Sequence, residues 1–259
     1  MPNDLLALVF SYAYVVLVVG VASLLRARGQ LSPETSRKVV HVLVGTWIIP
    51  TVVLFHNPWL AMLPPATFIL VNVLSYRFRL IGAMEEGDRN PGTIYFPLAF
   101  VLLIFLFWPP GGALGLVEPS DAAVDPTFPF SKFSIAAGIM AMAWGDAAAS
   151  IVGRRFGRTR FKVPGGEMKS VEGSLAFLVF ALLGMQFAAV VLLMASGPNG
   201  FPPGLTLQEA LSVAVRFRFL PILSAALAGA VAEAFTPKGL DNLSVPLVSA
   251  AVVRLLILV

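Results

Sequence analysis

Residues 171–195 read VEGSLAFLVFALLGMQFAAVVLLMA, and after Glu172 this run contains no charged side chain. A helix of about 20 apolar residues is long enough to cross the hydrocarbon core of a bilayer. Similar runs recur along the chain, at about 4–25, 37–55, 58–76, 94–108, 132–153, 211–234 and 244–259. The sequence therefore predicts an all-α, polytopic integral membrane bundle of about eight transmembrane helices, within a range of seven to nine because two runs are short.

The composition supports the same fold class. The chain is 58% hydrophobic and 12% charged, with a mean hydropathy of +0.85, which lies outside the range of soluble domains. A soluble helical protein would need amphipathic surface helices, and we identify none in the sequence. No linker is long enough to hold a soluble catalytic domain, so residues 1–259 are expected to form a single transmembrane catalytic domain.

Two features at the level of the whole chain exclude other classes. The chain has no cysteine, which excludes disulfides and thiolate metal sites. The segment that follows Met1 has no basic region, and the first apolar run is too long for the core of a cleavable signal peptide. We therefore expect this first run to be a membrane helix.

The basic residues predict an orientation. Fourteen of the 18 Lys and Arg residues fall near alternate loops, whereas the opposite loops, at 56–58, 109–131 and 196–210, are poor in them. The positive-inside rule places the basic loops in the cytoplasm and both termini outside. The chemically rich segments are all on the predicted cytoplasmic side, at about 26–38, 77–94, 154–170 and 235–243.

Two of these segments come early in the chain. Ser32-Pro33-Glu34 is a good helix start, and in that helix Arg37 and His41 share a face, with Lys38 beside them. This pattern also fits charges that only set the topology, together with one structural histidine. The second segment contains Asn90-Pro91-Gly92-Thr93, where Thr93 can cap the next helix and exposed amides can receive a phosphate. A plain surface turn would look the same.

The third segment follows the apolar run that contains Asp146. Asp146, Ser150 and Gly153 recur at helical spacing, so they share one face. A carboxylate in a membrane segment is costly and is a candidate functional group, and Mg²⁺ prefers such oxygen ligands. The basic residues that follow, from Arg154 to Lys169, could neutralise a triphosphate, and Glu172 could be a second metal ligand or a base. Alternatively, this loop could bind anionic lipid headgroups.

A fourth segment runs from Glu233 to Asp241-Asn242. Glu233 lies near the inner end of a predicted helix, and Asp241 could bind metal or, with Asn242, cap the last helix. The segment 164–170 superficially matches a phosphate-binding loop, but Met168 stands where that motif needs glycine and no strand is expected before it. We therefore reject a P-loop fold.

Together these motifs resemble the family of CTP-dependent lipid kinases that includes dolichol kinase, phytol kinase and yeast-type diacylglycerol kinase. The resemblance covers about residues 36–247, and Ser170 stands where relatives often have threonine. It implies transfer of the γ-phosphate of CTP to a lipid hydroxyl with Mg²⁺ or another divalent cation. The short chain suits a bacterial or plastid-type member, which implies the bacterial inner membrane, with the active site facing the cytoplasm.

The motifs and the resemblance together give the expected site. The metal ligands are expected among Asp146, Glu172 and Asp241. The base is expected to be His41, Glu172 or Glu233, and Asp146 and Lys169 complete the catalytic set. The nucleotide is expected to contact Arg37, Lys38, Asn90, Thr93, Gly153, Arg154, Arg155, Arg158, Lys169, Ser170 and Gly173.

The expected partners are CTP, a lipid alcohol and the surrounding membrane lipids, with no nucleic acid. The acceptor could be phytol, farnesol, geranylgeraniol, a polyprenol or dolichol, or diacylglycerol, and an isoprenoid alcohol is favoured. Both a monomer and a homo-oligomer fit the sequence. Two other functions fit parts of the pattern. A phosphatidate cytidylyltransferase also uses CTP and metal at a membrane, and a transporter of an anionic solute or lipid also carries intramembrane carboxylates.

Overall fold

The computed structural model describes residues 2–78, 92–108, 130–163, 168–195, 206–237 and 239–258. Its helices are α1 (Pro2–Ala27), α2 (Pro33–Thr46), α3 (Ile48–Leu54), α4 (Pro58–Phe78), α6 (Gly92–Phe107), α8 (Phe130–Phe156), α9 (Val171–Met194), α10 (Leu207–Phe235) and α11 (Asp241–Leu258). Two short strands, β1 (Arg160–Lys162) and β2 (Met168–Ser170), lie between α8 and α9. The all-helical membrane fold predicted from the sequence is confirmed.

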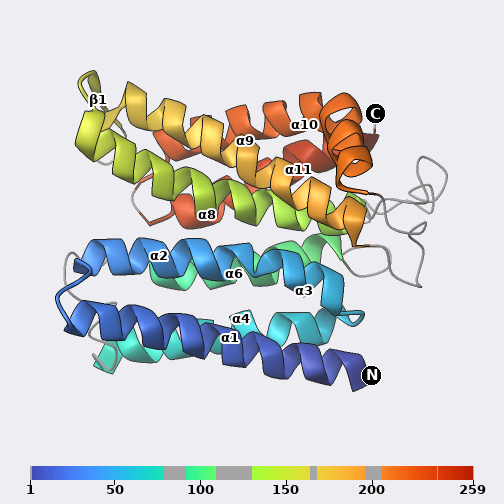
Figure 1. Ribbon diagram of the computed structural model, residues 1–259. Coiled ribbons are helices and arrows are strands. Elements are labelled where there is room, and N and C mark those ends of the chain that lie inside the picture. Colours follow the sequence, from blue (N-terminus) through green and yellow to red (C-terminus); the bar gives the residue numbers. More distant parts are fainter. Residues whose placement is uncertain are drawn as a thin grey trace.

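Within the described residues, five helices are long and apolar enough to cross a membrane, or six if the bent α10 is one span. The helix α6 is apolar but shorter than the others. The helices lie side by side, with α1 and α4 in one layer, α2, α3 and α6 next to them, and α8 to α11 beyond (Figure 1). Both termini lie at one end of the bundle, and the β1–β2 hairpin lies at the other (Figure 1).

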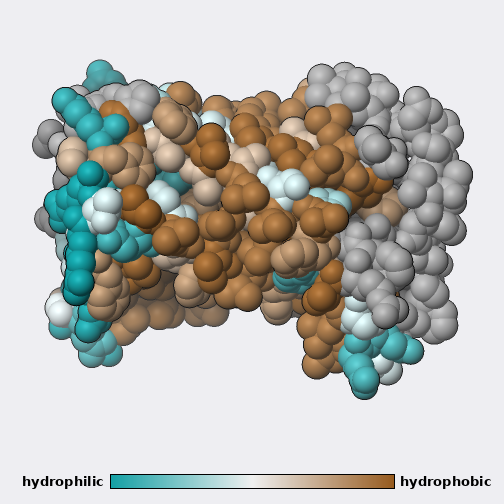
Figure 2. Space-filling model, turned by 90° about the horizontal axis from the view of Figure 1, so that it is seen from above, coloured by the Kyte–Doolittle hydropathy of each residue, from teal (hydrophilic) through white to brown (hydrophobic). Residues whose placement is uncertain are grey.

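The surface has the pattern of a membrane protein. Figure 2 shows an apolar surface over most of the helical bundle, with hydrophilic residues over the hairpin end and a smaller hydrophilic group at the opposite end. Large apolar side chains are exposed along the helices; Val16 is 67% exposed and Leu220 is 72% exposed. A soluble monomer rarely exposes so large an apolar area, whereas lipid tails cover it in a bilayer.

The centre of the bundle is α8, which packs on α9 and α11 on one side and on α2 and α6 on the other. Small residues allow this close packing. A Cβ added at Gly145 would lie 2.8 Å from the ring of Phe177, and one added at Gly153 would lie 3.5 Å from the Cα of Gly173. The backbones of α8 and α9 therefore approach closely where α8 carries Asp146.

Two predicted helices are not straight. The run 37–55 forms α2 and α3 with a break at Trp47, where Pro50 has no N–H to donate to the carbonyl of Thr46. The two halves of α10, Leu207–Val215 and Phe219–Phe235, are bent by 66°, just before Pro221. Proline removes a helical hydrogen bond and crowds the preceding turn, which accounts for both deviations.

The β1–β2 hairpin is an addition to the predicted all-helical chain. The strands are antiparallel and pair Arg160 with Ser170 and Phe161 with Lys169. Ser170 is also the N-cap of α9, because its hydroxyl accepts a hydrogen bond from the N–H of Gly173 at 3.1 Å. The basic loop predicted at 154–170 is thus partly an ordered hairpin that fixes Lys169 at the start of α9.

Candidate active site

A polar cavity of about 330 Å³ opens at the hairpin end of the bundle. Its walls come from α2, α6, α8, β1, β2, α9, α10 and α11, so segments far apart in the chain meet there. It is lined by Glu34, Arg37, Lys38, His41, Gly92, Thr93, Asp146, Ala149, Ser150, Gly153, Arg154, Arg160, Met168, Lys169, Ser170, Ser174, Glu233, Asp241 and Asn242.

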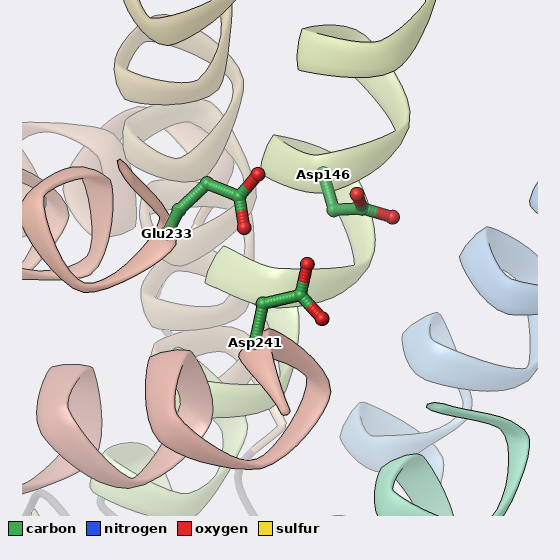
Figure 3. Close-up of side chains that lie close together, drawn as sticks. All are labelled: Asp146, Glu233 and Asp241. Atoms are coloured by element: carbon green, nitrogen blue, oxygen red, sulfur yellow. The ribbon is translucent and has the colours of Figure 1, made fainter. Parts of the chain in front are cut away.

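Three carboxylates form the centre of this cavity. Asp146 comes from α8, Glu233 from the end of α10 and Asp241 from the start of α11 (Figure 3). One ligand atom from each lies within 4.8 Å of the others. Three carboxylates at this spacing repel one another, and hard divalent cations are held by oxygen ligands of this kind. The cluster therefore fits a metal such as Mg²⁺.

Each of two lysines pairs with one of these carboxylates. Lys38 of α2 forms an ion pair with Asp146. Lys169 of β2 donates to Glu233 Oε1 at 2.8 Å and also to the backbone carbonyl of Glu233. All four side chains are largely buried, with 10–17% of each exposed. Such pairing offsets the cost of burying charge.

Asp241 is positioned by the turn before α11. Gly239 adopts a φ of +91°, a conformation that other residues rarely take, and its carbonyl accepts from the side chain of Asn242 at 3.2 Å. Asp241 Oδ1 accepts hydrogen bonds from the backbone and side-chain N–H groups of Asn242, each at 2.9 Å. Local bonds thus hold Asp241 at the helix start while its carboxylate lines the cavity. These bonds run to the next residue, whereas an N-cap accepts from an N–H two or three residues further on, so they are not the expected capping interaction.

His41 lies on the side of the cavity that faces α6. Its ring stacks on Phe96, with 3.7 Å between the ring centroids. Its Nε2 is buried and has no hydrogen-bond partner among the described residues. A buried polar atom without a partner costs free energy, so Nε2 is a candidate contact for a bound substrate.

The charges of the cavity suit an anionic substrate. Five cationic side chains, those of Arg37, Lys38, Arg154, Arg160 and Lys169, line it together with four carboxylates. Among the described residues that line the cavity, positive charges exceed negative charges by one, and a divalent cation would raise this excess to three. Arg154 of α8 pairs with Glu34 of α2; both residues line the cavity, and both side chains are about half exposed.

Most of the residues expected to contact the nucleotide line this cavity. Glu172 does not line it, because its carboxylate accepts from the N–H of Thr159 at 3.1 and 3.3 Å and holds the hairpin. Arg155 and Arg158 are also outside its lining, and the guanidinium of Arg155 lies 5.5 Å from the ring of Phe156. Gly173 lies behind Ser170, where α9 packs on Gly153. Asn90 lies outside the described residues, as does most of the predicted loop 77–94.

Sequence reasoning named Arg160 only among the basic residues that could neutralise a triphosphate, and Asn242 only beside Asp241 as a cap or metal site. It placed neither in the list of expected nucleotide contacts. Arg160 faces the cavity because the hairpin pairs it with Ser170, and Asn242 does so because it follows Asp241 in the first turn of α11. The one feature of the sequence that points to Arg160 and Asn242 is that each stands close to residues expected in the site.

Curated proteins with related sequences are lipid kinases. The chain is 33% identical over 241 residues to phytol kinase from Synechocystis sp., a match that covers 92% of this chain and 86% of that protein. It is 28% identical over 178 residues to dolichol kinase from Saccharomyces cerevisiae, covering 65% of this chain and 30% of that protein. A third relative, probable phytol kinase 1 from Glycine max, is 30% identical over 172 residues, or 61% of this chain and 49% of the relative. No family model matches the chain, and no solved structure matches it.

Proposed function

Because this chain belongs to the family of lipid-alcohol kinases that includes phytol kinase and dolichol kinase, we propose that it transfers the γ-phosphate of CTP to the primary hydroxyl of an isoprenoid alcohol in the bilayer. As a member of this family, the chain is a kinase whose phosphate donor is a nucleotide and whose acceptor is a lipid alcohol. CTP as the donor follows from the resemblance of its motifs. The observation that carries the proposal is the cluster of Asp146, Glu233 and Asp241 inside a cationic cavity at one end of an apolar bundle.

In this proposal the metal ligands are Asp146, Glu233 and Asp241. A divalent cation held by them would offset charge on the phosphates of the nucleotide. Glu172, which the sequence offered as a ligand, serves the hairpin instead, since its oxygens accept from Thr159. The site thus keeps three carboxylate ligands without it.

The two lysines have a second role once the carboxylates are neutralised. Without metal, Lys38 and Lys169 are the counterions of Asp146 and Glu233. If a cation were held by the carboxylates, the two ammonium groups would be able to donate to phosphate oxygens. Arg37, Arg154 and Arg160 add charge around the same cavity. Phosphoryl transfer depends mostly on such positioning and charge stabilisation.

His41 is the group we assign to the acceptor hydroxyl. Its Nε2 can accept the hydroxyl proton while the oxygen attacks the γ-phosphorus. The new bond joins that oxygen to the γ-phosphorus, the bond to the β-phosphate oxygen breaks, and CDP leaves with its electron pair. Glu233, another candidate base, is engaged by Lys169 and by the metal cluster.

We also propose that residues 1–259 act as one catalytic domain in the bacterial inner membrane with the cavity facing the cytoplasm. The basic hairpin lies at the end of the bundle opposite both termini, and the positive-inside rule assigns that end to the cytoplasm (Figure 1). In the proposed orientation the cavity would face the compartment that contains the cellular nucleotides.

The proposal is tested by the fate of labelled phosphorus. Purified protein, Mg²⁺ and a panel of lipid alcohols, diacylglycerol and phosphatidate are incubated with CTP labelled at the α- or the γ-phosphorus. The proposal predicts label from the γ position in the lipid product of an isoprenoid alcohol. Label from the α position in a phosphatidate product would identify a cytidylyltransferase instead.

A further inference from the structure

We infer that an apolar crevice between α1, α2, α4 and α6, which meets the polar cavity at His41, binds the hydrocarbon chain of the acceptor and admits one chain rather than two. This inference rests on the proposed function. It assigns recognition of the acceptor's hydrocarbon chain to α1, α2, α4 and α6. Three residues, Arg37, His41 and Thr93, line both the polar cavity and the crevice.

The crevice is lined by residues of two packed helix pairs, α1 with α2 and α4 with α6. The helices α2 and α6 also both pack on α8. Pro64 and Pro65 of α4 and Pro97 of α6 lie in its wall. Their pyrrolidine rings add apolar surface to this wall, although each proline also leaves the carbonyl four residues earlier without its helical N–H donor. Most of the remaining wall is Val, Ala, Phe and Trp.

Two buried polar atoms mark the end of the crevice nearest the cavity. His41 Nε2 and Asn72 Oδ1 have no hydrogen-bond partner among the described residues. The amide nitrogen of Asn72 donates to the carbonyl of Thr93 at 2.7 Å, so the Oδ1 atom of Asn72 remains available to accept. A primary hydroxyl has one donor and two lone pairs, and it can satisfy such atoms while its chain continues along the apolar wall.

The dimensions favour one chain. The crevice reaches from Asn72 to Ala61 along α4, which is about 16 Å at 1.5 Å per residue. Its volume is about 150 Å³. A cavity of about this volume in a protein interior holds a molecule the size of benzene, so over such a length the space is narrow. A single thin chain can enter with small side-chain movements, whereas the two acyl chains of diacylglycerol cannot lie in it together.

Two adjacent valines of α1 provide a matched test. Val15 lines the crevice and is 6% exposed, whereas Val16 faces the lipid and is 67% exposed. We expect Val15→Phe to raise the KM for geranylgeraniol and phytol by about tenfold or more, since overfilling an apolar site is unfavourable. The KM for CTP should stay within about twofold of wild type, and Val16→Phe should leave both constants unchanged. An unchanged KM for both alcohols in a folded Val15→Phe protein would overturn the inference.

A measurement on the unmodified chain covers the case in which Val15→Phe does not fold. Wild-type protein is irradiated with a geranylgeraniol analogue that carries a diazirine in the chain, and labelled residues are identified by mass spectrometry. We expect label at crevice positions such as Val44 and Phe100 that excess phytol displaces. Label confined to lipid-facing positions such as Val16 and Leu70 would contradict the inference.

The acceptor panel separates this inference from the proposed function. If the wild-type protein phosphorylates isoprenoid alcohols but not diacylglycerol, the result supports both the proposed function and the single-chain inference. Phosphorylation of diacylglycerol at a comparable rate would overturn the single-chain inference and leave a lipid kinase. Absence of lipid phosphorylation with every acceptor would contradict the proposed function itself.

Discussion

Lys38 on α2 forms an ion pair with Asp146 on α8, although 108 residues separate them in the chain. The pair joins the first helices of the bundle to its central helix at the cavity. It also gives Asp146 a counterion in the absence of metal. The same arrangement recurs between Lys169 and Glu233, so two of the three clustered carboxylates each have their own lysine.

Replacing Lys38 should affect stability and activity by separable routes. In Lys38→Met the carboxylate of Asp146 stays largely buried without its cation, and we expect a loss of about 2–3 kcal/mol of stability, somewhat below the range for fully buried pairs. The double variant Lys38→Met/Asp146→Asn removes both charges and should recover much of this loss while remaining inactive. Thermal unfolding in detergent measures the first effect and lipid phosphorylation the second. A double variant less stable than Lys38→Met would contradict this account.

The metal ligands can be distinguished from a structural carboxylate. Glu233 belongs to the cluster, whereas the carboxylate of Glu172 binds the N–H of Thr159. We expect Glu233→Gln to weaken Mn²⁺ binding, measured by electron paramagnetic resonance, by about tenfold or more, because a charged ligand is lost. Glu172→Gln should bind Mn²⁺ as wild type does. If Mn²⁺ binding were weakened equally in both variants, Glu172 would have to be counted among the metal ligands.

Neighbouring arginines should differ in nucleotide binding. Arg154 lines the cavity, and Arg155 does not. Arg154→Gln should raise the KM for CTP by about tenfold, the equivalent of about 1.4 kcal/mol. Arg155→Gln is the matched control and should change it by less than about twofold, since exposed charges at a distance are screened by salt. The interpretation of Arg154 fails if the two variants behave alike in initial-rate assays.

The orientation can be tested with single cysteines, since the chain has none of its own. Lys162 is exposed on the hairpin, and Leu207 is 56% exposed at the start of α10, at the opposite end. In intact bacterial spheroplasts, a membrane-impermeant maleimide should label Leu207→Cys directly. It should label Lys162→Cys only after the membrane is broken. The reverse pattern would place the cavity outside the cell.

Much of the fold and part of the site follow from local sequence. Long apolar runs fix the helices because backbone groups in lipid must be paired internally. Helical spacing places Arg37 with His41, and the N-cap pattern at Ser32 is present, with its hydroxyl accepting from Thr35 at 3.1 Å. The grouping of chemical residues at one end of the bundle follows from the alternation of basic loops.

Other features depend on how helices meet. Nothing near Glu233 in the sequence shows that Lys169 reaches it, since 64 residues separate them. Glu172 looks like a ligand by composition, but the hairpin offers it the N–H of Thr159. The crevice is lined by residues from α1, α2, α4 and α6, so it depends on how four helices meet and leaves no local sequence pattern.

The most direct test of the account compares wild type with Asp241→Asn in one transfer assay. Each purified protein is mixed with Mg²⁺, geranylgeraniol and CTP labelled at the γ-phosphorus, and lipid-bound label is followed with time. The account predicts that wild type forms labelled lipid phosphate. Asp241→Asn, at equal thermal stability, should form it at no more than about one hundredth of the wild-type rate, because a ligand of the metal site is lost. Equal rates from the two proteins would show that transfer does not depend on the carboxylate cluster and would contradict the account.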